Sequence, residues 1–233
     1  MTGFDVSAPL FAIAARFVGV DKVRHYLHGV QIEPHPAGGA LLVATDGHRL
    51  LCAHDETGTA DRPAIIQLDR PQLAIARGKP GQGYTDRRLR GTYAETDPSR
   101  RTRVEIVDVA DETGDGSVVG AASDVEIAGD YPDWRRIIPR EPVTAPGLND
   151  FDGDYLADFV AAGAAYRKAF THGKGAGPMT VAAANTGDPA FVRWGGVENM
   201  FGILMPMRRS SKPEAVELPR FMFTRPAAQD EAA

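Results

Sequence analysis

Apolar residues recur at the three- and four-residue spacing of an amphipathic helix in three separate stretches of this chain. Ser7 can cap the first stretch, and Pro9 lies in its first turn, where a missing backbone N–H is harmless. Gly78 can end the second stretch. The third stretch carries the most continuous apolar stripe. The predicted helices are Ala8 to Val18, Pro71 to Arg77 and Asp154 to Phe170.

Runs of β-branched and apolar residues lie between these helices, and clusters of Gly, Pro and Asp separate them. The N-terminus is predicted to form a strand before the first helix. Several strand-like runs follow each helix, which indicates a threefold repeat of one helix-plus-strands unit. This order predicts an α+β fold with mostly antiparallel sheet. The predicted strands are Val30 to Glu33, Ala40 to Ala44, Ala64 to Leu68, Val104 to Val109, Val118 to Ile127, Met179 to Ala184, Phe191 to Trp194 and Phe201 to Met205.

Two stretches do not fit the repeat. Residues 78–103 are rich in Gly, Thr and Arg, and we interpret them as an insertion. Residues 210–233 are interpreted as a C-terminal extension with one short apolar run, PRFMF, and a frayed polar end. The arginines of the insertion either extend a basic surface or are ordinary solvated charges of a hairpin. They are Arg87, Arg88, Arg90, Arg100, Arg101 and Arg103.

Composition narrows the classes of protein to which the chain can belong. With 233 residues, 43% hydrophobic and 24% charged, it matches an ordinary globular protein of one large domain or two small ones. The net charge of -5 argues against a protein that coats nucleic acid with its whole surface, but it allows a local basic face. The single cysteine, Cys52, excludes an internal disulfide framework and favours a reducing, intracellular setting. No apolar run approaches the roughly 20 residues of a membrane span, so we expect no membrane partner.

No arrangement of residues in the sequence indicates catalysis. A GxSxG nucleophile motif is absent, and the pair Gly173 and Lys174 is not followed by the Ser or Thr of a phosphate loop. His25 and His28 have a spacing that suits a metal on a helix, but their run reads as strand or loop and no nearby carboxylate completes a ligand set. We therefore expect a protein that is not an enzyme and that uses no metal or cofactor.

Four motifs are more specific than the rest of the sequence. VRHYLHGVQIE begins at Val23, LLVATDGHRL at Leu41, DYPDWRRIIP at Asp130 and FGILMPMR at Phe201. In this order they resemble the bacterial beta sliding clamp family, the processivity ring of the replicative DNA polymerase. The resemblance spans about residues 4–208 and implies the DNA clamp fold.

The resemblance also implies a function without catalysis. Clamps of this family encircle duplex DNA, are placed by a clamp loader, and tether DNA polymerase and other proteins through a hydrophobic pocket that binds a short peptide. The resemblance further implies a cytoplasmic protein that is associated with the nucleoid. Trp134 stands where the family usually has tyrosine. The residues that match the pocket are Leu27, Thr45, Gly47, His48, Arg49, Leu50, Pro132, Arg136, Ile137, Ile203, Leu204, Met205, Pro206, Met207 and Arg208.

Several of these pocket residues have a plainer interpretation. Ile203, Met205, Pro206 and Met207 could instead be core and turn positions. Methionine suits a site that accepts many peptides, because its flexible thioether adapts to different partners.

A sliding ring has to contact phosphates and not bases, since base readout would arrest it. Cations on or beside the predicted helices, and a loop that matches a DNA-approaching loop of the family, are the candidates. Asp154 and Asp158 on the third helix leave its role toward DNA open. The candidates are Arg16, His25, Tyr26, Arg70, Arg77, Lys79, Arg167 and Lys168.

The chain is short for this family, whose subunits have roughly three domains of ~120 residues. We predict a complete clamp-type domain over 1–140 with the insertion at about 78–103, a half domain over 141–209, and an extension over 210–233. Since the family's ring contains about twelve helix-plus-strands units and this chain contributes three, we predict a homotetrameric ring with head-to-tail contacts, and a trimer as the alternative.

The shortness of the chain suggests a clamp encoded by a phage, plasmid or other mobile element. The alternative function is a clamp-like adaptor or decoy that binds clamp-binding peptides without encircling DNA.

Overall fold

The structure is a computed structural model that describes residues 2–78, 87–93, 102–109, 116–138 and 149–207. Its α-helices are α1 (Ala8–Ala14), α2 (Arg70–Arg77) and α3 (Gly153–Phe170). Short 3-10 helices include η1 (Ala15–Phe17), η2 (His25–Leu27) and η4 (Trp134–Ile137). The strands are β1 (Gly3–Ser7), β2 (Val30–Pro34), β3 (Ala40–Thr45), β4 (Arg49–Asp55), β5 (Thr59–Ala60), β6 (Ala64–Ile66), β7 (Arg87–Tyr93), β8 (Thr102–Val109), β9 (Gly116–Ala122), β10 (Glu126–Ile127), β11 (Met179–Ala182), β12 (Ala190–Trp194) and β13 (Met200–Leu204).

Local sequence sets where the helices begin and end. The Ser7 hydroxyl accepts a hydrogen bond from the first turn of α1. At the start of α2, the Asp69 carboxylate accepts from the Gln72 N–H while the Gln72 side chain accepts from the Asp69 N–H, which is a capping box. Gly78, with φ of 71°, ends α2. The three predicted helices are confirmed.

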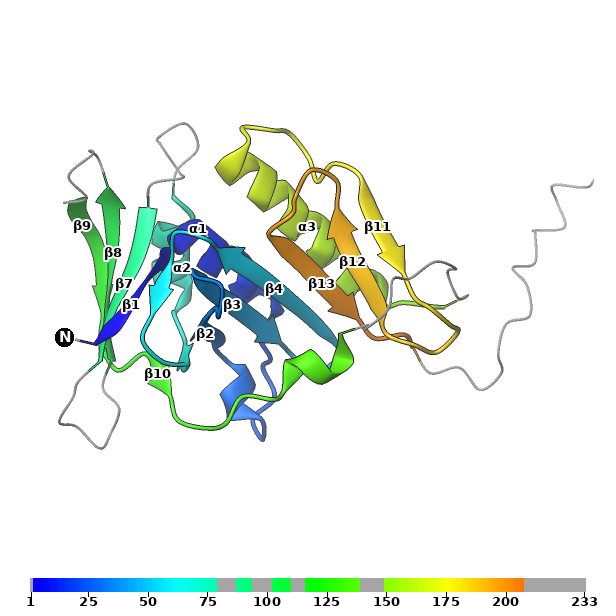
Figure 1. Cartoon of the computed structure of the whole chain (residues 1–233), viewed down its shortest axis with the longest axis horizontal. Helices are drawn as coiled ribbons and strands as arrows, with labels where there is room; N and C mark the ends of the chain where they lie inside the picture. The colour runs from blue at the N-terminus through cyan, green and yellow to red at the C-terminus, as the bar shows by residue number, and fades with distance from the viewer. Residues whose placement is uncertain (1, 79–86, 94–101, 110–115, 139–148, 208–233) are drawn as a thin grey trace, which may run out of the picture.

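The strands form two antiparallel sheets. The five-stranded sheet has the order β5-β1-β7-β8-β9, and the eight-stranded sheet has the order β10-β6-β2-β3-β4-β13-β12-β11. Figure 1 shows β9 at one end of the molecule and β11 toward the other. This combination of helices and antiparallel sheet confirms the predicted α+β class.

Each α-helix and the three strands that follow it form one repeating unit. The first unit contains β1, α1 and β2–β4, the second contains β6, α2 and β7–β9, and the third contains α3 and β11–β13. The first two units exchange their leading strands: β1 pairs with β7, and β6 pairs with β2. The third unit joins the first unit through antiparallel pairing of β13 with β4.

The main core lies between the helices and the sheets. Phe17 and Phe159 meet with ring centroids 4.8 Å apart, and both are fully buried. The Trp194 indole N–H donates a hydrogen bond to the Phe159 carbonyl at 3.1 Å. Aromatic side chains therefore connect the first unit to the third across the helix side of the sheet.

The stretch interpreted as an insertion contains a strand of the framework. β7 lies between β1 and β8, and Gly91 of β7 faces Phe4 so closely that a Cβ would lie 2.1 Å from its ring. The insertion interpretation is therefore wrong for Arg87–Tyr93. Residues 79–86 and 94–101 lie outside the described residues.

The arginines of β7 and β8 form ion pairs with carboxylates of both sheets. Arg87 pairs with Asp108, and Arg88 pairs with Asp5 at 2.6 Å and with Asp55 at 3.2 Å. These arginine charges are thus paired with carboxylates of the folded structure. The other ion pairs of this stretch are Arg90 with Asp5 and Arg103 with Glu105, while Arg100 and Arg101 lie outside the described residues.

Two other strand predictions need correction. The run predicted as one strand over 118–127 is two strands, because the chain turns at Asp124 (φ 58°) and β10 joins the other sheet. β4 was not predicted, although it pairs with both β3 and β13. None of the described helices is long and apolar enough to cross a membrane.

Candidate functional site

A second apolar cluster lies on the outer face of the eight-stranded sheet, the face turned away from the helices. Along β4, Leu50 and Cys52 belong to this cluster, whereas the alternate residue Leu51 belongs to the main core. On the adjacent strand β13, Ile203 lies opposite Leu50 in the antiparallel register. The buried members of this outer-face cluster are Leu41, Val43, Leu50, Cys52, Trp134 and Ile203.

The segment that leads into η4 crosses the outer face and closes one side of the cluster. The Tyr131 hydroxyl accepts a hydrogen bond from the Thr45 N–H (3.0 Å) and donates one to the Val43 carbonyl (3.3 Å). Burial raises the pKa of Tyr131, so the hydroxyl keeps its proton at neutral pH and can donate this bond. Trp134 of η4 then packs into the cluster, with its ring centroid 6.5 Å from that of Phe201 on β13.

The turn between β3 and β4 forms a second side. The Asp46 carboxylate accepts hydrogen bonds from the backbone N–H groups of His48 (2.8 Å) and Arg49 (3.0 Å). Gly47 has φ of 92°, a conformation that favours glycine. These constraints fix the turn and hold the exposed His48 ring over Tyr155, with centroids 6.0 Å apart.

The residues after β13 form a third side. The Met205 N–H donates to the His48 carbonyl, and the Met207 N–H donates to the Asp150 carbonyl, each at 2.8 Å. These two hydrogen bonds hold residues 205–207, which we call the rim, against the β3–β4 turn and the start of the third unit. Solvent reaches 55% of Met207 and 38% of Ile137 in η4. These two side chains are exposed apolar groups on segments that border the cluster.

Two predicted pocket residues do not belong to the outer-face cluster. Leu27 is 2% exposed and packs against Gly19, and Leu204 lies in the main core on the other side of β13 from Ile203. Strand alternation next to Ile203 was the signal that could have placed Leu204 correctly. Arg208 lies outside the described residues. The predicted residues that surround the cluster or its rim are Thr45, Gly47, His48, Leu50, Pro132, Arg136, Ile137, Ile203, Met205, Pro206 and Met207.

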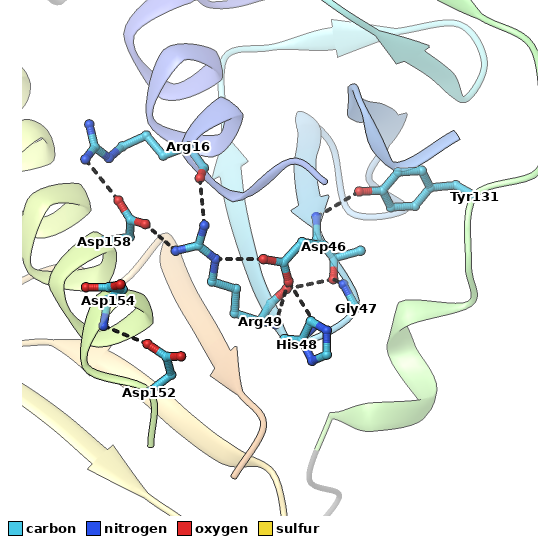
Figure 2. Close-up of polar contacts among 10 residues, drawn as sticks. Arg16, Asp46, Gly47, His48, Arg49, Tyr131, Asp152, Asp154 and Asp158 are labelled. Atoms are coloured by element: carbon cyan, nitrogen blue, oxygen red, sulfur yellow. Dashed lines mark hydrogen bonds and ion pairs between the residues drawn. The ribbon is translucent and has the colours of Figure 1, made fainter. Parts of the chain in front are cut away.

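Arg49, also predicted for the pocket, connects the first unit to α3 (Figure 2). Its guanidinium pairs with Asp46 at 3.1 Å and with Asp158 of α3. Arg16, in the middle of η1, pairs with the other oxygen of Asp158 at 3.1 Å. Figure 2 shows both arginines converging on this one carboxylate. The third unit is thus held to the first by a shared ion pair.

Aromatic rings enclose the Arg49 guanidinium. Its Cζ lies 5.1 Å from the centroid of the Phe17 ring and 4.7 Å from that of Tyr155. Only 9% of the Arg49 side chain is exposed, so its charge depends on these partners and not on water. Arg49 is a structural residue of the joint between units.

The predicted DNA-contacting residues differ in their accessibility. Arg16 is 36% exposed but paired with Asp158, and Arg167 is partly buried against the loop at Gly177. Tyr26 is half-buried beside Gly129, and Lys79 lies outside the described residues. The exposed candidates are His25 in η2, Arg70 and Arg77 at the two ends of α2, and Lys168 on α3.

Sequence reasoning missed a cavity beside the outer-face cluster. It has a volume of about 600 Å³, and Leu41, Cys52 and Phe201 contribute its apolar lining. On each strand this residue is two positions from a buried member of the cluster, which is Val43 on β3, Leu50 on β4 and Ile203 on β13. This alternation was the available signal. Burial raises the pKa of the Cys52 thiol to about 12, so this side chain remains a neutral thiol at physiological pH. The remaining lining residues are His35, Pro36, His54, Glu56, Trp134, Arg135, Glu198 and Asn199.

Comparison with solved structures decides which fold these surfaces belong to. The chain is similar to a sliding clamp from Bartonella birtlesii bound to griselimycin (17% identity, TM-score 0.59, 89% of this chain and 66% of that chain covered). It is also similar to the polymerase III beta subunits of Thermotoga maritima (13%, TM-score 0.59, 90% and 66%) and Borrelia burgdorferi (15%, TM-score 0.56, 89% and 64%). This chain has the fold of a bacterial beta sliding clamp.

The clamp fold here spans 64% to 66% of the length of those three proteins. No protein-family model matches the sequence, and no curated protein sequence matches it. Within the part of the chain that the structure describes, no group of three or more His, Cys, Asp or Glu side chains is placed to hold a metal ion.

Proposed function

We propose that this chain is a subunit of a sliding clamp, which encircles duplex DNA as a ring of identical copies and tethers a DNA polymerase to it. The observation that carries the proposal is the clamp fold itself, in which three of the four sequence motifs contribute residues to the outer-face cluster. The first two units are a complete clamp-type domain, the third is a half domain, and residues 210–233 are an extension. The protein acts in the cytoplasm at the nucleoid, is placed on DNA by a clamp loader, and is not an enzyme.

In this proposal the helix side of the molecule faces DNA. The exposed cations Arg70, Arg77 and Lys168 are carried by α2 and α3, and they contact phosphates without reading bases. Arg16 contributes less than its position suggests, because Asp158 already neutralises it. A chain with a net charge of -5 can still line a pore with cations if its acidic residues lie elsewhere.

Partner proteins bind at the outer-face cluster through a short apolar peptide. The buried side chains of Leu50 and Ile203 support this site from beneath, and its accessible rim is Ile137, Met205 and Met207. The methionine thioethers adapt to different side chains, which suits a surface shared by several partners. The neighbouring cavity, bounded by Trp134 and Phe201, gives a bound peptide room to continue past η4.

Retention on circular DNA tests the encirclement. When rings are assembled around nicked circular DNA and washed at high salt, we expect the protein to stay on the circle and to leave once a single cut linearises it. Salt screens phosphate contacts but cannot release a closed ring from a circle. The amount of protein that co-elutes with each DNA form is the measurement.

Equal loss from circular and linear DNA at high salt would refute encirclement. If peptide binding persists in that case, the chain acts as a clamp-like adaptor or decoy. A circle that carries a bulky protein block on each side of the cut is the control, because both ends of that linear DNA are then closed and a true ring remains trapped on it.

Loss of the apolar rim tests the peptide site. The double substitution Ile137→Asp and Met207→Asp is expected to weaken binding of a labelled polymerase-derived peptide roughly 100-fold, since each side chain loses on the order of 1.5 kcal/mol of apolar burial. Both side chains are exposed, so the fold should tolerate the change. Fluorescence anisotropy gives the dissociation constants.

The matched control is the double substitution Val118→Glu and Val119→Glu. These valines are also exposed but lie on β9, in the other sheet. Peptide affinity should be unchanged in this control. An unchanged affinity in the Ile137 and Met207 variant would instead remove the outer-face cluster as the peptide site.

A further inference from the structure

Two kinds of joint connect the three units within this chain. In the first kind, the strand that precedes the helix of each unit pairs with the first strand after the helix of the other unit. The pairs are β1 with β7 and β6 with β2. We call this a first-strand joint. In the second kind, the units meet at their last strands, as β4 and β13 do. We call this a last-strand joint. The first unit uses both of its sides, one in each kind of joint.

The other two units each leave one side open. In the described part of the second unit, the last strand β9 is the sheet edge, and in the third unit the first strand β11 is the sheet edge. The second unit therefore has an open last-strand side, and the third has an open first-strand side. Figure 1 shows these edges toward opposite ends of the molecule.

Apolar side chains are exposed at both open sides. On β9, Val118 is 55% exposed and Val119 is 39% exposed. On α3, Val160 is 46% exposed. Edge strands of stable monomers usually carry charge or proline that prevents pairing with other chains, and neither valine provides this protection.

The exposed face of α3 points away from the first unit. At about 100° per residue, Val160 lies roughly 160° around the helix from Asp158, which pairs with the first unit. Leu156 and Ala164 lie one turn to either side of Val160 and are only partly buried. In the first two units the corresponding side is covered, because α1 and α2 pack together there. The third unit lacks this partner within the described residues.

We infer that further copies of this chain close both sides through two-fold joints: the third unit pairs with the third unit of one neighbour, and β9 pairs with β9 of another. Within the chain, first-strand sides join only first-strand sides, and last-strand sides join only last-strand sides. A second copy offers each kind of open side only on the same unit. A two-fold interface pairs a surface with itself and so satisfies both requirements.

This inference rests on the proposed ring and changes its symmetry. Head-to-tail contacts would require β9 to meet β11, a last strand against a first strand, and the described residues contain no joint of that kind. Two different two-fold joints must alternate, so the ring closes only with an even number of copies. Four copies then match the predicted ring, a trimer does not, and neighbouring copies present their peptide sites on opposite faces of the ring.

Solution masses of variants distinguish the two symmetries. We expect about 100 kDa for the unmodified protein, which is four copies of 25.0 kDa. Val160→Glu breaks only the third-unit joint, and Val118→Glu with Val119→Glu breaks only the β9 joint. Each should give dimers of about 50 kDa, and the combined variant should give monomers of about 25 kDa. Light scattering after size exclusion measures these masses.

A head-to-tail ring predicts a different result. It has one kind of joint, so either variant alone would give monomers, and that outcome would overturn the inference. An unmodified protein that is a monomer, dimer or trimer would also overturn it. The matched control is Val23→Glu, which adds the same charge at a valine that is 82% exposed. Val23 lies in the first unit, whose two sides are both used within the chain, so this variant should keep the tetramer.

Failure of this inference is separable from failure of the proposed function. The outer-face cluster lies within one chain, so dimeric and monomeric variants should keep the peptide affinity of the unmodified protein. Unaltered thermal melting and peptide binding also show that each variant is folded. A tetramer that stays on circular DNA, but whose single variants are monomers, would refute the two-fold joints and leave the clamp function intact.

Discussion

Replacing Arg49 with alanine is expected to lower the free energy of unfolding by about 3–5 kcal/mol. The change removes a largely buried guanidinium that pairs with Asp46 and Asp158, and it leaves the Asp158 carboxylate facing α1 with only Arg16. It also removes the cation from between two aromatic rings. Chemical denaturation followed by circular dichroism measures the loss.

The control for this prediction is Arg16→Ala. Arg16 pairs with the same carboxylate at 3.1 Å, but its side chain is 36% exposed, so its removal should cost about 1 kcal/mol or less. Equal losses for the two substitutions would show that burial does not set the strength of this network. The same experiment shows whether the third unit unfolds separately, because Arg49 joins α3 to the first unit in addition to the pairing of β13 with β4.

The second large effect is expected from Phe159→Ala, which should destabilise the protein by about 3–5 kcal/mol. Phe159 is fully buried, and its ring lies 4.8 Å from that of Phe17 and 6.1 Å from that of Trp194. It also packs on Gly202, where a Cβ would lie 2.2 Å from the ring. Removing the ring leaves a cavity that these rigid neighbours cannot fill.

Equilibrium denaturation measures this loss, and Val20→Ala is the control. Val20 is 91% exposed, so its truncation should change stability by no more than about 0.5 kcal/mol. A loss well below 2 kcal/mol for Phe159→Ala would mean that the third unit repacks around the gap. In that case the contact between α3 and the first unit is looser than the structure indicates.

The helices could be predicted from sequence because their signals are local. Ser7, Asp69 and Gly78 cap or end helices through groups only a few residues away. The apolar stripe of each helix is likewise contained in its own stretch. The motifs at residues 41–50 and 201–208 also located both sides of the outer-face cluster, since each motif is short and contiguous.

β7 could not be predicted because its partners are distant. Its arginines made the stretch read as an exposed insertion, yet Arg88 pairs with Asp5, which is 83 positions away in the sequence. Nothing local distinguishes a charge that will be neutralised by another strand from one that will stay in water. Strand pairing gives no periodic signal beyond the alternation of side chains.

The sequence by itself determined the helices, the unit repeat, the α+β class and the segments that border the site. Tertiary structure decided the role of each side chain in those segments. Arg49 became part of a joint because Asp158, 109 positions away, lies beside it, and Leu204 became core because β13 pairs with β4 in one particular register. Tertiary structure likewise left β9 and β11 as open edges. The physical reason is that capping and helical spacing act within a few residues, whereas burial, ion pairing and strand register depend on contacts that exist only after the chain has folded.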